Sequence, residues 1–281
     1  MNAIQRFITA SFDLLLQPLE WVGMEFALIL VSGVFSVLAL LIFKHISPQT
    51  SIRRAKDLIK GHMIEIRLYQ DDLGLVTRAI GKVLWHNMRY MCLNFGPFVP
   101  LAIPFALVAG QLVARYAFDP MPVSETVPLE LAGGGNTLSL AWSGNEEVRV
   151  SFPEGVVAVS PLTQVAEQGR AFQEFVVSAP GYHEITLERA GVSTTKHVWA
   201  GERPVEGRRY PAIQPLRTSN WEQILWPAEG ALNSWQRIEF RYPESTLGWL
   251  PGRGPSGVLL NLILFSVLFG LLAIKPLGVE I

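Results

Sequence analysis

The chain has 281 residues, of which 49% are apolar and 17% are charged, and its mean hydropathy is +0.29. A soluble domain carries about 25% charged residues, so this composition favours a membrane protein. The net charge of −1 excludes the strongly basic surface of a nucleic-acid-binding protein, and the single cysteine, Cys92, excludes an intrachain disulfide and a cysteine-rich zinc site.

The N-terminal segment, residues 1–20, has apolar side chains at helical spacing with polar residues largely between them. This pattern predicts an interfacial amphipathic helix that lies on the membrane surface. Pro18 is expected to end this helix, because proline breaks helical hydrogen bonding. Trp21 follows it and is expected to anchor the chain in the headgroup layer.

The first membrane span is expected at residues 26–43, a run without a charged residue. The run is longer than the apolar core of a signal peptide, which has about 7–15 residues, and no small-residue cleavage site follows it. We therefore expect it to stay in the membrane.

Residues 44–91 are predicted to form a basic helical hairpin. Apolar residues recur at helical spacing on both sides of a turn at residues 70–74, and Asp71 or Asp72 is expected to cap the second helix. Four basic residues form a candidate docking site for anionic lipid or a partner: Arg53, Arg54, Lys56 and Lys60. Contact with anionic lipid explains the cluster most simply, and a docking surface for a ribosome, RNA or an acidic protein is the alternative.

Two further spans follow, at residues 93–115 and 257–275. The second span contains Pro97, Pro100 and Pro104, which are expected to kink it. Three polar residues of the second and third spans are candidates for intramembrane contacts, because polar groups at membrane depth are costly: Gln111, Asn261 and Arg115. Each amide is expected to bond another helix or a partner subunit, and ordinary packing between helices explains this most simply.

The charge distribution predicts the orientation. Residues 44–91 hold nine basic and four acidic residues, whereas residues 117–256 hold eleven basic and sixteen acidic residues. The positive-inside rule then places the hairpin and the C-terminus in the cytoplasm, and the N-terminus and residues 117–256 outside. We expect an integral protein of the bacterial inner membrane with a periplasmic segment 117–256.

In residues 120–250 the apolar residues no longer recur at helical spacing. Several runs alternate apolar and polar residues, and turn residues such as Gly133–Gly135 separate them, which predicts an antiparallel β-sandwich that resembles an immunoglobulin module. A hairpin is expected at Gly191. Its C-terminal part is rich in tryptophan: Trp199, Trp221, Trp226, Trp235 and Trp249. Trp249 is expected to be an interface anchor, whereas Trp221 and Trp226 fit either a ligand groove or a short helix packed on the sandwich.

The elements together predict a membrane α-helical protein with three transmembrane helices, a cytoplasmic helical hairpin and an extracytoplasmic antiparallel β-sandwich domain. No sequence motif for catalysis, phosphate binding or metal binding is recognised, and Cys92 is expected to be a small buried residue. We therefore expect a protein that is not an enzyme, with no cofactor, no metal, no nucleic-acid partner and no identified small-molecule substrate.

The order of these parts resembles the core of the YidC/Oxa membrane-insertase superfamily. The resemblance covers residues 1–116 and 257–276 and consists of a first span, a basic hairpin between Pro48 and Arg89, a kinked span from Leu93 and a further span. It implies a hairpin that receives a client or a ribosome and a polar groove, open to the cytoplasm, that moves the client's tail partway across the bilayer. The family's groove commonly carries a buried arginine, whereas Arg115 lies near the outer end of its span.

Three functions remain open from the sequence. The first is a structural or accessory subunit of an envelope complex that docks other membrane subunits through its β-domain and its spans. The second is an insertase or assembly factor for client proteins, and the third is an extracytoplasmic ligand sensor. Expected partners are other membrane proteins or clients and anionic lipid.

Overall fold

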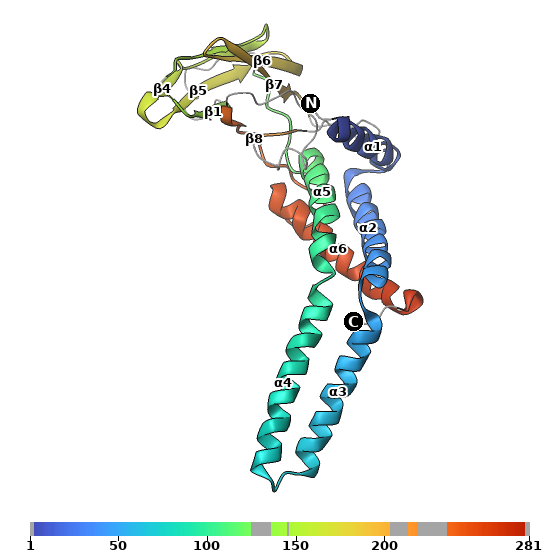
Figure 1. Ribbon diagram of the computed structural model, residues 1–281. Helices are drawn as coiled ribbons and strands as arrows, with labels where there is room; N and C mark the ends of the chain where they lie inside the picture. Colours follow the sequence, from blue (N-terminus) through green and yellow to red (C-terminus); the bar gives the residue numbers. More distant parts are fainter. Residues whose placement is uncertain (1–2, 125–135, 145, 203–212, 219–234, 279–281) are drawn as a thin grey trace. The chain divides into compact units, whose positions relative to one another are not determined.

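The computed structural model describes residues 3–124, 136–144, 146–202, 213–218 and 235–278. Contacts divide the chain into two compact units, one made of residues 1–30 and 107–262 and the other of residues 31–106 and 263–281. The Gly133–Gly135 turn, Trp221 and Trp226 lie outside the described residues. The helices are α1 (Ala3–Glu20), α2 (Met24–Ile46), α3 (Gln49–Leu68), α4 (Leu73–Phe95), α5 (Phe98–Tyr116) and α6 (Gly254–Leu277) (Figure 1).

Among the described residues, three helical stretches are long and apolar enough to cross a membrane: α2, the stretch Leu73–Tyr116 that contains α4 and α5, and α6. This agrees with the prediction of a helical membrane part. The middle stretch is interrupted only where α4 ends at Phe95 and α5 begins at Phe98, around Pro97. Pro100 lies in the first turn of α5, where a missing N–H loses no helical bond, and α5 continues through Pro104.

The two helices α3 and α4 pack side by side as a hairpin (Figure 1). The Asp72 side chain caps α4, because its Oδ1 accepts hydrogen bonds from the backbone N–H groups of Gly74 and Leu75 at 2.9 and 3.1 Å. Between the helices, the imidazole rings of His62 and His86 stack with centroids 5.5 Å apart. The two histidines therefore lie in the contact between the helices.

Small residues let α2 and α6 approach closely. The Ser36 hydroxyl donates to the carbonyl of Ser266 at 2.6 Å, and the Ser266 hydroxyl donates to the carbonyl of Ser32 at 3.2 Å. A Cβ atom on Gly270 would lie 2.9 Å from the Ser36 hydroxyl, so a larger residue there would separate the helices. Small residues and hydroxyl bonds of this kind are typical of packed membrane helices.

The part of the first unit that the structure describes contains two antiparallel sheets. One has the order β3-β5-β1-β9-β8 with β4 also paired to β5, and the other has the order β2-β6-β7. The strands are β1 (Asn136–Trp142), β2 (Val148–Ser151), β3 (Val156–Ala158), β4 (Thr163–Val165), β5 (Arg170–Val177), β6 (Gly181–Arg189), β7 (Val192–Ala200), β8 (Leu216–Thr218) and β9 (Trp235–Phe240). The predicted hairpin at Gly191 joins β6 to β7, and both Ala190 and Gly191 have positive φ.

Alternate residues of the strands are buried, as a half-exposed sheet requires. Their buried side chains form one hydrophobic cluster to which both sheets contribute, with Phe175 and Phe240 from one sheet and Leu187 and Val198 from the other. Trp235 belongs to this cluster and packs edge to face on Trp142 at 6.0 Å. The core of the β-structure is therefore apolar and contains part of the predicted tryptophan group.

Candidate functional site

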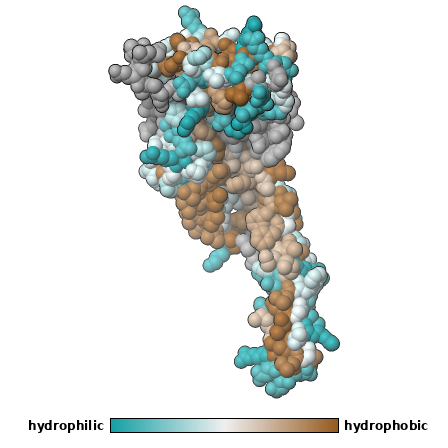
Figure 2. Space-filling view, turned by 90° about the vertical axis from the view of Figure 1, so that its left-hand side faces the viewer, coloured by the Kyte–Doolittle hydropathy of each residue, from teal (hydrophilic) through white to brown (hydrophobic). Residues whose placement is uncertain are grey.

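The first feature is a row of exposed apolar side chains on α4, which we call the α4 row: Leu73, Ile80, Leu84, Met88, Met91 and Phe95. Their spacing of three, four or seven residues places them on one face of the helix. Arg78, Lys82 and Arg89 lie on the opposite face and are exposed. Figure 2 shows apolar surface along the hairpin as a brown strip beside paler and teal residues.

The sequence predicted the α4 helix, but it did not predict that the residues of this row are exposed. Apolar periodicity finds a helix with an apolar face, but the same spacing fits a covered face and an open one. In the structure, α4 turns Ala79 and Tyr90 toward α3, with the Tyr90 ring 5.5 Å from the Lys56 ammonium. Leu84 and Met88 point elsewhere and stay exposed.

The α4 row leads to a cavity in the same unit. The cavity has a volume of about 310 Å³, and almost all of its lining is carbon. It lies between α2, the α4–α5 junction and α6, and its lining residues are Phe35, Ser36, Ala39, Leu40, Phe43, Asn94, Phe98, Leu101, Ser266, Val267, Gly270, Leu271 and Ile274. Asn94 follows Met91 of the α4 row by less than one helical turn, so the row and the cavity are neighbours.

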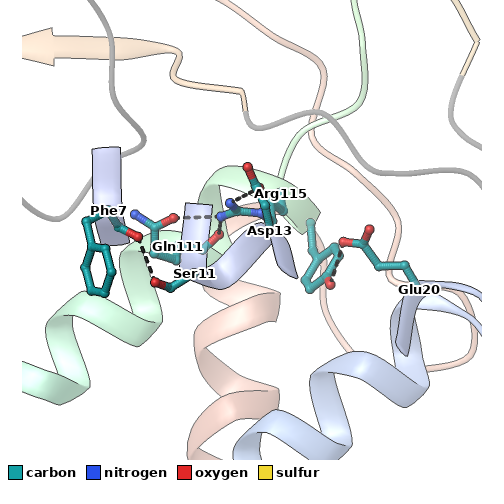
Figure 3. Close-up of polar contacts among 7 residues, drawn as sticks. Phe7, Ser11, Asp13, Glu20, Gln111 and Arg115 are labelled. Carbon is teal, nitrogen blue, oxygen red and sulfur yellow. Dashed lines mark hydrogen bonds and ion pairs between the residues drawn. The ribbon is translucent and has the colours of Figure 1, made fainter. Parts of the chain in front are cut away.

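The second feature is a polar network at the N-terminal helix, in the first unit (Figure 3). The guanidinium of Arg115 donates to Oδ1 of Asp13 at 2.6 Å and to Oε1 of Gln111 at 2.7 Å. The Tyr116 hydroxyl donates to Oε1 of Glu20 at 3.0 Å. Asp13 and Glu20 are seven residues apart and share a face of α1, so both acidic residues of that face bind the end of α5.

Burial makes this network costly to break. The Arg115 side chain is 1% exposed and the Asp13 side chain 25%, so the cation depends on its protein partners while the carboxylate reaches water. The bonds fasten α1 to α5. They leave another face of α1 uncovered, on which Phe7 and Leu14 are exposed, and an open apolar face of this kind is typical of an interfacial helix.

Two sequence expectations, one about Asn261 and one about Pro18, need correction. Asn261 was expected to bond another helix or a partner subunit, and within the chain its Nδ2 donates instead to the carbonyls of Pro251 and Gly257, which lie before α6 and in its first turn. It therefore fixes the start of its own helix. Pro18 was expected to end the N-terminal helix, but α1 continues to Glu20, and Gly23, with φ of +139°, lies in the bend that follows.

Most of the remaining predicted residues are exposed. Arg53, Arg54 and Lys60 are exposed, whereas Lys56 is half-buried over the Tyr90 ring. Trp21 and Trp249 are 70% and 72% exposed, and their role as interface anchors stays a prediction. Cys92 is exposed rather than buried as expected, because it lies on α4 between the α4 row and the basic face, away from α3.

Comparisons with known proteins add no relative. No protein-family model, no curated protein and no solved structure matches the chain. In the described part of the chain, no group of three or more histidine, cysteine or acidic side chains could hold a metal ion. The arrangement of the α4 row and the cavity is therefore the basis for any functional conclusion.

Proposed function

We propose that this chain is an insertase-like assembly factor that binds apolar segments of other membrane proteins. The observation that carries the proposal is the α4 row, which ends beside an apolar cavity between three membrane helices. Large exposed apolar patches on a protein commonly mark surfaces that bind apolar partners. The activity is of the kind that the resemblance to the YidC/Oxa superfamily implies.

The chemistry of the α4 row suits varied clients. Two of its six residues, Met88 and Met91, have flexible and polarisable side chains that adapt to different partners. The basic residues Arg78, Lys82 and Arg89 on the opposite face keep that face solvated. A hairpin built in this way presents one binding face to a client and one polar face to water.

The proposal includes an orientation in the membrane. The excess of basic residues in the hairpin favours a cytoplasmic location, which leaves the β-structure on the outer side of a bacterial inner membrane. We propose that the two sheets pack as a sandwich, because one hydrophobic cluster contains side chains of both. The exposed Trp21 and Trp249 suit the outer headgroup layer in this orientation.

Photocrosslinking from the hairpin tests the proposal. A photoreactive residue in place of Leu84, which is 64% exposed in the α4 row, is expected to crosslink to ribosome-bound nascent membrane proteins. The matched control is the same photoreactive residue in place of Lys82, which is exposed on the opposite face. Equal crosslinking from both positions, or crosslinking only to lipid, would contradict the proposal.

A second candidate function is that of a structural or accessory subunit of an envelope complex. Four exposed apolar residues gather where β3, β4 and β5 pair: Val157, Val159, Val165 and Phe172. Purification from native membranes is expected to recover a partner in stoichiometric amount, and the double variant Val157→Ser/Phe172→Ser is expected to lose it. A monodisperse single chain from native membranes would count against this function.

A further inference from the structure

Four basic residues lie along one face of α3, and we call them the α3 stripe: Arg53, Lys56, Lys60 and Arg67. Their spacing of three, four or seven residues aligns them on the helix. Arg53, Lys60 and Arg67 are exposed. The ammonium of Lys56 lies 5.5 Å from the centre of the Tyr90 ring on α4, so the stripe borders the contact between the two helices of the hairpin.

The α3 stripe and the α4 row lie on the same side of the hairpin. The stacked rings of His62 and His86 mark the other side of the helix contact. The His62 ring bonds Glu65 at 2.8 Å, and Lys82 lies one turn before His86, so Glu65 and Lys82 belong to the histidine side. Helical spacing places the α3 stripe on the flank of α3 away from Glu65, and the α4 row on the flank of α4 away from Lys82. One surface of the hairpin thus combines an apolar row with a basic edge.

Acidic residues do not offset the charge of this edge. The α4 helix, Leu73–Phe95, contains no acidic residue. Those of α3 are Glu65, which lies on the histidine side, and Asp57, which lies on the face opposite the buried Ala55. Residues 49–95 hold eight basic and four acidic residues, so the hairpin as a whole attracts negative charge.

This surface is complementary to an amphipathic helix that has acidic residues beside its apolar face. The α4 row extends over about 33 Å, at about 1.5 Å per residue of helix, which matches a partner helix of about 20 residues. A helix of this kind places apolar side chains from successive turns against an apolar surface. Opposite charges along the edge of such a contact select the partner and fix its orientation.

Two other occupants match the surface less well. A second copy of the hairpin would bring another basic stripe to the basic edge, and like charges repel. A bilayer surface would have to cover the whole row. The α3 helix has 20 residues, about 30 Å, and within its unit it runs on from α2 to the turn of the hairpin, so Leu73 lies far from the membrane end of the row (Figure 1).

We infer that the α4 row and the α3 stripe together bind an amphipathic helix with an acidic edge, supplied by a partner protein. This inference rests on the proposed function, because it names the class of segment that the hairpin accepts. The α4 row supplies the apolar contact, and Lys60 and Arg67 of the α3 stripe determine specificity through their charge. All of these residues belong to the same compact unit of the chain.

The test uses the full chain in vesicles of zwitterionic lipid, with a photoreactive residue in place of Leu84 of the α4 row. Three synthetic helical peptides of about 20 residues share one apolar face. They carry glutamate, glutamine or lysine at the positions that flank this face. The readout is the yield of crosslinked peptide as the peptide concentration rises, measured at low and at high salt.

We expect the glutamate peptide to bind about three- to tenfold more tightly than the glutamine peptide, as a few exposed ion pairs allow. The lysine peptide should bind more weakly than the glutamine peptide. High salt should bring the three affinities together, because it screens exposed charges. Equal affinities of the three peptides at low salt would overturn the inference.

A pair of matched double variants locates the charge effect. Lys60→Glu/Arg67→Glu reverses two charges of the α3 stripe and is expected to make the lysine peptide the tightest of the three. Arg78→Glu/Arg89→Glu changes the net charge by the same amount on the opposite face of α4 and should leave the preference for glutamate. Equal effects of the two double variants would overturn the assignment to the stripe. The three peptides on the chain without these substitutions keep the test decisive if a variant does not fold.

The outcomes separate the inference from the proposed function. Equal crosslinking of the three peptides would leave the α4 row as an apolar client surface and remove its preference for acidic partners. Crosslinking to anionic lipid in place of the glutamate peptide, when such lipid is added to the vesicles, would assign the surface to the membrane and overturn the inference. Absence of crosslinks from Leu84 to every peptide and to nascent chains would count against the proposed function itself.

Discussion

Asp13 and Arg115 form an ion pair that fastens α1 to α5. Replacing Asp13 and replacing Arg115 are expected to weaken this attachment to different extents. The structural reason is burial, because the Arg115 side chain is 1% exposed and the Asp13 side chain 25%. Asp13→Asn leaves a buried cation without a counter-charge, with only neutral oxygens such as those of Gln111 as acceptors. Arg115→Met leaves a carboxylate that can turn to water. The first substitution should therefore cost more than the second.

The magnitude follows from the geometry of the pair. Two unit charges about 4 Å apart attract by about 4 kcal/mol at an effective dielectric constant of about 20, and breaking a buried pair costs about 3–5 kcal/mol. Because Asp13 is partly hydrated and Gln111 remains as an acceptor, we expect about 2–3 kcal/mol for Asp13→Asn. Arg115→Met should cost about 1–2 kcal/mol, and the double variant should resemble Arg115→Met alone.

Hydrogen exchange of the α1 amides, measured on the full chain in micelles, reads out this cost as local opening. Asp13→Asn is expected to lower the protection of these amides by about 30- to 150-fold, since about 1.4 kcal/mol is a factor of ten. The matched control is Ser11→Ala, because the Ser11 hydroxyl bonds only the Phe7 carbonyl within α1 among the contacts drawn in Figure 3. Equal losses for both single variants, or additive losses in the double variant, would refute the reasoning.

Three further substitutions test the hairpin and the β-core. Phe175→Ala should destabilise the β-structure by about 3–5 kcal/mol, because this fully buried ring packs edge to face on Phe240 in the core; thermal melting followed by circular dichroism measures it, and a loss under 1 kcal/mol would contradict the assigned core. Asp72→Ala should weaken the α4 cap by about 1 kcal/mol, seen as faster exchange in the first turn, and unchanged exchange would count against the cap. The hydrogen bond from His62, with the charge of Lys82, lowers the pKa of Glu65 below its usual value of 4.5. A lowered pKa stabilises the folded hairpin above that value and the effect is lost as the pH falls through the folded pKa, so Glu65→Gln should reduce hairpin protection at pH 6, and the reduction should shrink as the pH falls below 4.5; a pH-independent loss would exclude this linkage.

The sequence by itself determined the local elements. Apolar runs predicted the three stretches of the described residues that are helical, long and apolar enough to cross a membrane, and alternating runs predicted antiparallel β-structure. These patterns are visible in one dimension because the helical and strand periods repeat along the chain. The turn before α4 with Asp72 as its cap, and the hairpin at Gly191, were also readable because turn and cap chemistry is local.

The tertiary structure alone decided which side chains meet and which stay open. Arg115 was visible as a polar residue near the end of a span, but its partner Asp13 is distant in the chain, and no local pattern joins them. Asparagine is a residue type that is expected to bond between membrane helices, but Asn261 bonds the start of its own helix. The α4 row has the spacing of a core face, and only the position of α3 on the other side of α4 leaves it exposed. Contacts between distant segments depend on packing in three dimensions, which periodicity does not encode.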